Sequence, residues 1–199
     1  MWRREPGEPA VNPAAPWVVA GAPASWLEIG EQLAERLRNG APEQAEAPAG
    51  LAIGTEITSH RVALLMDPFR TFRREPPSGG FEARAVDQTR ADRAGNCKDL
   101  SLLLLNDLTS QQLPAYVVFR ATALSSLTTC IPCPYVFDHV LVALPARGGA
   151  WFLDPYAGQR EYRAGVALDK RVQTLDNQLL VAWNPNARVP ARATKEMDH

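Results

Sequence analysis

Apolar positions in the first half of the chain recur every three or four residues, which is the spacing of one face of an α-helix. This pattern predicts helices over residues 25–38, 59–74 and 83–91, and a leucine-rich helix that begins near Cys97. Ser25 and Glu28 have the spacing of a capping box at the start of the first helix. Pro68 lies inside the second helix, where we expect it to produce a kink.

The period changes after Pro114, where short runs rich in β-branched and aromatic residues predict strands. These runs cover residues 115–121, 137–144, 151–154 and 178–183. The sequence PARGG at 145–149 has turn composition, so the second and third strands should form an antiparallel hairpin. Helices followed by an antiparallel sheet indicate the α+β class.

The composition indicates one globular domain. The chain has 199 residues, of which 46% are hydrophobic and 22% charged, and a chain of this length can bury a sizeable core. Both ends are rich in proline, alanine and charge. We therefore expect a loosely ordered segment over residues 1–24, one domain over 25–184 and a disordered tail over 185–199.

Charge and hydropathy exclude several classes of partner. The 21 basic and 22 acidic residues nearly cancel, so the chain lacks the basic surface of a nucleic-acid-binding protein. No apolar run approaches the roughly 20 residues that span a bilayer, and prolines interrupt any secretory signal near the start. We expect a cytoplasmic protein, or a periplasmic one if this is a domain of a longer exported chain. The sequence leaves the oligomeric state open.

The stretch RAGNCKDLSLLLLNDL, residues 93–108, places a cysteine at the start of the leucine-rich helix. Asn96 is a good N-cap, and Asp99 can close a capping box with it, so the helix should begin at Cys97. Unpaired backbone N–H groups and the positive end of the helix dipole favour a thiolate there. A thiolate is the nucleophilic form of cysteine.

Two polar residues stand in the predicted hairpin. His139 lies within the apolar strand FDHVLVAL, and Asp154 ends the strand WFLD. Adjacent strands can bring them side by side, where a carboxylate would orient the imidazole as base and acid for a thiol. Asp138 should point to the opposite face of its strand. Cys97, His139 and Asp154 together are one way to assemble an activated thiol.

The three segments GNCKDLSLLLLNDL, FDHVLVAL and WFLDPYAG resemble the core of the transglutaminase-like superfamily of cysteine enzymes, and the resemblance extends over about residues 25–183. It is strongest with the bacterial branch in which this core follows a domain of unknown function. The resemblance implies a papain-like α+β fold. It also implies Cys97 as nucleophile, His139 as general base and acid, and Asp154 as the residue that orients the imidazole. Asn96 and Asp99 cap the helix start and so support the position of Cys97 from behind the triad.

The expected chemistry is acyl transfer through a thioester. The thiolate would attack an amide or ester carbonyl of a peptide or protein substrate, and the backbone N–H of Cys97 would bind the oxyanion. Water as acceptor makes a protease or amidase, and an amine makes an acyltransferase. Hydrolysis is our first expectation. No cofactor or metal is required.

Two other interpretations of the sequence compete with that of a cysteine acyl-transfer enzyme. The fold could serve as a non-catalytic module that binds a peptide or partner, with Cys97 as a small buried side chain, His139 as a satisfied strand histidine and Asp154 as a turn cap. A thiol redox role for Cys130 and Cys133 ranks lowest, because neighbouring prolines oppose the helix start that such a motif uses.

The number of available ligands argues against a structural zinc site. Such a site takes four ligands, and beyond Cys130 and Cys133 the chain offers no second pair, only three histidines: His60, His139 and His199. No acidic loop suits calcium either. We expect the cysteine pair in a loop at the rim of the site, where it could form a disulfide in an oxidising environment. Lys98 should lie in solvent, with the alternative that it adds a positive field near the thiolate.

Overall fold

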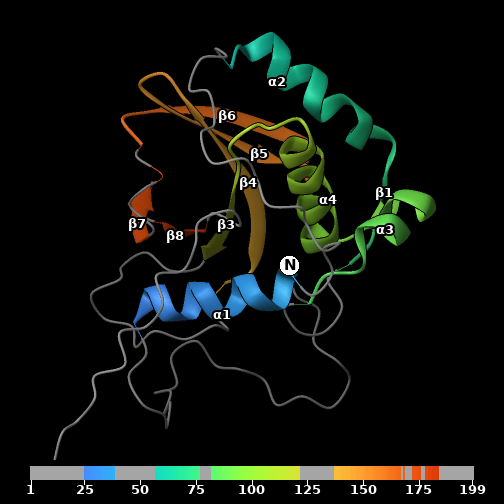
Figure 1. Cartoon of the computed structure of the whole chain (residues 1–199), viewed down its shortest axis with the longest axis horizontal. Helices are drawn as coiled ribbons and strands as arrows, with labels where there is room; N and C mark the ends of the chain where they lie inside the picture. The colour runs from blue at the N-terminus through green and yellow to red at the C-terminus, as the bar shows by residue number, and fades with distance from the viewer. Residues whose placement is uncertain are drawn as a thin grey trace, which may run out of the picture.

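The structure is a computed structural model of the 199-residue chain. It describes residues 25–38, 57–76, 82–121, 137–166, 168, 172–175 and 178–183 (Figure 1). Several predictions lie outside these ranges: the loosely ordered ends over 1–24 and 185–199, and the placement of Cys130 and Cys133. Helices come first and an antiparallel sheet follows, which confirms the α+β class.

The α-helices are α1 (Trp26–Arg38), α2 (Ser59–Met66), α3 (Val86–Asp92) and α4 (Cys97–Ser110). The capping box predicted for the first helix is confirmed. The Glu28 N–H donates to Ser25 Oγ at 3.1 Å, and the Ser25 N–H donates to Glu28 Oε2 at 2.9 Å. These two hydrogen bonds satisfy backbone donors that a helix start leaves without partners.

The second predicted helix was too long. Its α-helical part stops at Met66, a 3-10 helix η1 covers Asp67–Thr71, and an extended strand β1 covers Arg73–Arg74. Pro68 has no N–H to continue the helical ladder, so it ends the α-helix instead of kinking it. Strand β1 pairs in parallel with β2 (Ala94–Gly95), a pair too short to leave a sequence pattern.

The main sheet has six strands in the order β6-β5-β4-β3-β8-β7, and every neighbouring pair is antiparallel. The strands are β3 (Tyr116–Ala121), β4 (His139–Ala146), β5 (Gly149–Asp154), β6 (Gln159–Ala164), β7 (Val172–Leu175) and β8 (Gln178–Trp183). The predicted hairpin is β4 and β5. Its turn is tighter than expected, because Gly148 adopts the positive φ of 74° that a short turn requires.

Two edge strands were not predicted. In β6, QREYRA, no residue is buried, so the strand lacks the alternation that marks a half-buried strand. Strand β7 is four residues long and pairs only with β8. Strand β8 was predicted from its apolar run, and it pairs with β3 on the side away from β4.

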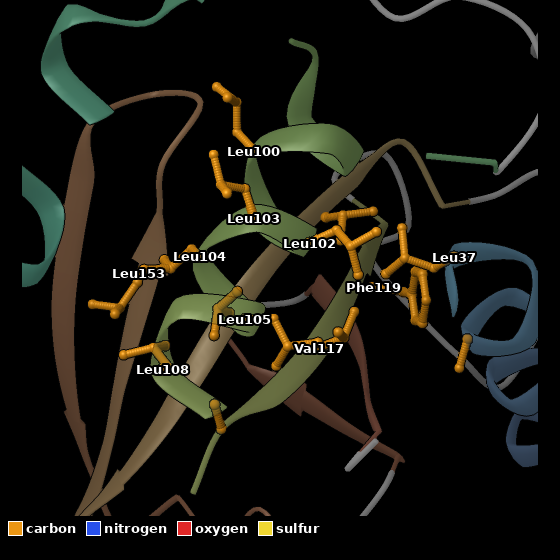
Figure 2. Close-up of a cluster of buried hydrophobic side chains, with 14 of the residues drawn as sticks. Leu37, Leu100, Leu102, Leu103, Leu104, Leu105, Leu108, Val117, Phe119 and Leu153 are labelled. Carbon is orange, nitrogen blue, oxygen red and sulfur yellow. The ribbon is translucent and has the colours of Figure 1, made fainter. Parts of the chain in front are cut away.

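The core lies on the face of the sheet that α4 covers. Figure 2 shows the leucines of α4 above strand residues that include Val117, Phe119 and Leu153, with Leu37 of α1 close to Phe119. The leucines at helical spacing in the sequence are all buried: Leu100, Leu103, Leu104 and Leu108. Leu102 and Leu105 are buried too, so α4 is enclosed well beyond one face. None of the helices in the described ranges has the length and apolar character needed to cross a membrane.

Candidate active site

Cys97 is the first residue of α4, as the sequence predicted, and a complete capping box holds this end of the helix. Asn96 Oδ1 accepts from the N–H groups of Lys98 and Asp99 at 2.9 and 3.3 Å. Asp99 Oδ2 accepts from the Asn96 N–H at 2.9 Å. Asp99 Oδ1 also accepts from the Arg84 N–H at 2.7 Å, which ties the helix start to the segment that leads into α3.

The capping box leaves one donor of the first turn available. The Leu100 N–H donates to Asn96 O, and the caps occupy the N–H groups of Lys98 and Asp99. Within the described residues, no hydrogen bond uses the Cys97 N–H. An N–H group at the N-terminus of a helix, on the residue that carries the thiol, has the position and dipole direction to bind a developing oxyanion.

Gly95 is expected to be required at this helix start. A Cβ atom at this position would lie 2.7 Å from Asp99 Cβ, which is closer than two carbons can pack. Gly95→Ala should therefore lower the free energy of unfolding by roughly 1–3 kcal/mol, the usual cost of overpacking. Urea denaturation followed by circular dichroism measures this change. A variant as stable as the parent would show that Asp99 can move aside without losing its cap.

His139 begins β4 and Asp154 ends β5, and the structure brings their side chains together. His139 Nε2 lies 2.6 Å from Asp154 Oδ2. Both side chains are largely buried, with 14% and 9% of their surfaces exposed. The second carboxylate oxygen, Oδ1, accepts from the Ala157 N–H at 2.8 Å. Because Asp154 occupies Nε2, Nδ1 is the ring nitrogen left to face another group.

Cys97 and Asp154 together set the charge of the imidazole. Burial alone would lower the pKa of His139, but hydrogen bonds with Asp154 and with the Cys97 side chain, and the charges of both, raise that pKa to about 9. Burial likewise opposes ionisation of Asp154, yet the hydrogen bond and charge of His139 hold the pKa of this carboxyl below its usual value. The imidazole is therefore protonated at neutral pH, between a carboxylate and the thiol group.

The raised pKa of His139 predicts a pH dependence of stability. The folded value of about 9 lies above the ordinary 6.5, so the contribution is fully present below pH 6.5 and is lost as the pH rises to about 9. We expect a decrease on the order of 1–3 kcal/mol across this window. Urea denaturation at several pH values measures it, with His139→Ala as the control that removes this group alone. A parallel decrease in both proteins would contradict the prediction.

Lys98 is a correction to the sequence analysis. It was expected in solvent, yet only 3% of the residue is exposed. Burial lowers the pKa of its ammonium group, against the opposing charges of Cys97, Asp99 and Glu82. The apolar stem of lysine allows such burial on a helix that is itself enclosed. Lys98 therefore adds a positive charge close to the thiol.

Arg120 is a further charged residue near the site that the sequence analysis did not single out. It lies on β3 directly opposite His139 in the strand register, and its charge favours the ionised form of Asp154. The Asp138 N–H donates to Arg120 O at 3.1 Å. The one signal in the sequence was an arginine inside the otherwise apolar strand AYVVFRA.

The side chains at this site are a thiol, an imidazole and a carboxylate, which suit thiol chemistry. Among the residues that the structure describes, no three His, Cys, Asp or Glu side chains gather in a way that could hold a metal ion. A thiol, a protonated imidazole and a carboxylate can act together in nucleophilic attack and proton transfer. These are the chemical capabilities that the geometry supplies.

Comparisons with known proteins leave the function to be argued from this geometry. No protein-family model matches the chain, and no curated protein matches it. A crystal structure of a candidate protease from Parabacteroides distasonis aligns with 64% of this chain at 15% sequence identity and a TM-score of 0.48. The alignment covers 26% of that protein, so this chain spans about a quarter of its length.

Proposed function

We propose that this protein is a thiol-dependent acyl-transfer enzyme of the transglutaminase-like type, with a papain-like core and a Cys97-His139-Asp154 triad. One observation carries the proposal: His139 Nε2 lies 2.6 Å from Asp154 Oδ2 in a largely buried pair, and the charges of Asp154 and Cys97 favour the protonated imidazole. A protonated imidazole beside a thiol at neutral pH is the partner that a thiolate needs.

The first half of the reaction would form a thioester. The Cys97 thiolate attacks the carbonyl carbon of an amide, a C–S bond forms, and the carbonyl electron pair moves to oxygen. The Cys97 N–H binds this oxyanion. The intermediate then collapses, the C–N bond breaks, and the leaving amine takes a proton from His139.

The second half would return the enzyme to its starting state. His139, now neutral, takes a proton from water while the water oxygen attacks the thioester carbon. A C–O bond forms, the C–S bond breaks, and the thiolate is restored beside a protonated His139. Asp154 holds the imidazole in place throughout and stabilises its charge. We propose hydrolysis of a peptide or amide bond as the main outcome, with transfer to an amine as the variant of this step.

Alkylation of Cys97 with iodoacetamide at different pH values tests the proposal. In the parent protein Cys97 should react faster than Cys130 and Cys133 at each pH, because a protonated imidazole beside the sulfur stabilises the thiolate. In His139→Ala this advantage should be lost. Peptide mass spectrometry follows Cys97 in the full chain, with Cys130 and Cys133 as internal controls.

One observation favours a second candidate, a binding module that keeps the fold without catalysis. Only 4% of Cys97 is exposed, and a substrate must reach the sulfur atom. A module of this kind predicts a Cys97 that reacts more slowly than Cys130 and Cys133 and that ignores the His139→Ala substitution. That result would overturn the enzyme proposal in favour of binding.

A further inference from the structure

The Arg74 side chain binds three backbone carbonyl groups close to the candidate site. Its Nη1 group donates to Phe69 O at 2.9 Å and to Phe72 O at 2.6 Å. Its Nε group donates to Tyr156 O at 2.6 Å, across a separation of 82 residues. The side chain is partly buried at these contacts. One guanidinium group thus joins η1 and its C-terminal end to the turn that follows β5.

That turn carries Asp154. The Asp154 carboxylate uses one oxygen to accept from the Ala157 N–H at 2.8 Å and the other to contact His139 Nε2 at 2.6 Å. Tyr156 lies between Asp154 and Ala157, and its ring meets the His139 ring edge-on at a centroid distance of 6.3 Å. The carbonyl that Arg74 binds is therefore in the middle of the turn that sets the carboxylate and flanks the imidazole.

An arginine suits this position for a geometric reason. Its planar fork presents several N–H donors in fixed directions, so it can bind carbonyls on opposite sides at once. Lysine has a single nitrogen at the end of its chain and cannot span both sides in the same way. Arg73, the preceding residue, is directed elsewhere: its side chain is 75% exposed and pairs with Glu75.

We propose that Arg74 is a positioning residue that fixes the turn at 154–157 and thereby holds the Asp154 carboxylate against His139. The meaning of this role for catalysis rests on the proposed function. The charged groups that face Asp154 are His139 from β4 and Arg120 from β3. Within the described part of the chain, the hydrogen bonds of the Arg74 side chain all go to backbone carbonyls, so its effect is exerted through the geometry of the turn.

Titration of His139 by NMR in the full chain tests the proposal, with Arg74→Gln compared with Arg73→Gln. The parent protein and Arg73→Gln should both show a pKa near 9 for His139. In Arg74→Gln the pKa should fall towards the ordinary value of about 6.5, because the carboxylate is no longer held in place. Alkylation of Cys97 at pH 6 should slow by about tenfold in this variant alone. A folded Arg74→Gln protein with the parental titration overturns the inference.

Arg74→Lys covers the case in which Arg74→Gln does not fold. Lysine keeps the positive charge and can still donate to the carbonyls of Phe69 and Phe72, so the fold should survive. The pKa of His139 should then lie between those of the parent and an ordinary histidine. A folded Arg74→Lys protein that titrates like the parent counts against the inference.

The titration separates this inference from the proposed function because it requires neither substrate nor a reactive thiol. If Cys97 of the parent protein is unreactive, the enzyme proposal fails, and the shift of His139 in Arg74→Gln still decides the role of Arg74. If Cys97 of the parent protein is reactive and Arg74→Gln behaves like the parent, only the positioning role fails.

Discussion

Asp154→Ala is expected to lower acyl transfer from an activated ester by about 10⁴-fold, the scale found when a triad loses its carboxylate. The substitution removes the hydrogen bond and the charge of Asp154 that raise the pKa of His139, so that Cys97 alone is left to oppose the effect of burial. The pKa of His139 should then fall, and the imidazole loses the partner that orients it. Turnover of a p-nitrophenyl ester and NMR titration of His139 measure the two effects.

Asp154→Asn removes the charge but keeps the size of the side chain. Its single amide oxygen can accept either from the Ala157 N–H or from His139 Nε2, because the NH₂ group takes the place of the other carboxylate oxygen. We expect the pKa of His139 to fall in this variant, with a loss of activity of about 10⁴-fold. An alanine variant that is folded, retains the parental activity and keeps the pKa of His139 near 9 would exclude Asp154 from the mechanism.

Leu103→Ala is expected to lower the free energy of unfolding by about 2–5 kcal/mol. Leu103 has no exposed surface and belongs to the buried cluster around α4 (Figure 2), and a cavity in a packed core closes only in part. A loss of this size is a large fraction of the stability of a domain of this length. Urea denaturation followed by circular dichroism measures it.

Leu64→Ala provides the matched control. Leu64 is on α2 and is 60% exposed, so the same substitution should change the free energy of unfolding by less than about 0.5 kcal/mol. Equal losses in the two variants would mean that α4 is not the centre of the core. A small loss at Leu103 alone would show that the core can collapse around the missing side chain.

Local signals in the sequence predicted the thiol end of the site well. The capping hydrogen bonds of Asn96 and Asp99 span at most three residues, so the spacing of residue types is enough to place the start of α4 at Cys97. The leucines at helical spacing correctly predicted buried positions of α4. This spacing did not predict the burial of Leu102 and Leu105, because a helix enclosed on several sides loses the polar face that defines a stripe.

The other parts of the site depend on contacts that a local pattern does not encode. The sequence indicated that His139 and Asp154 could meet across a hairpin, and the role of this pair in catalysis stays a prediction. Arg74 left no signal, because its partners are backbone carbonyls that every residue carries. Lys98 was misplaced for a related reason, since its burial follows from the surroundings of α4 and not from its neighbours in the sequence.

The order of strands in the sheet has a consequence for how the chain is made. His139 and Asp154 are on β4 and β5, which pair with each other and are synthesised before β8. Strand β3 receives its second neighbour only when residues 178–183 emerge, because β8 pairs with the edge of β3 that β4 leaves open. A nascent or shortened chain that ends before β8 would expose this central edge to other chains. Premature termination near the C-terminal end therefore favours aggregation, although every residue of the proposed triad is already present.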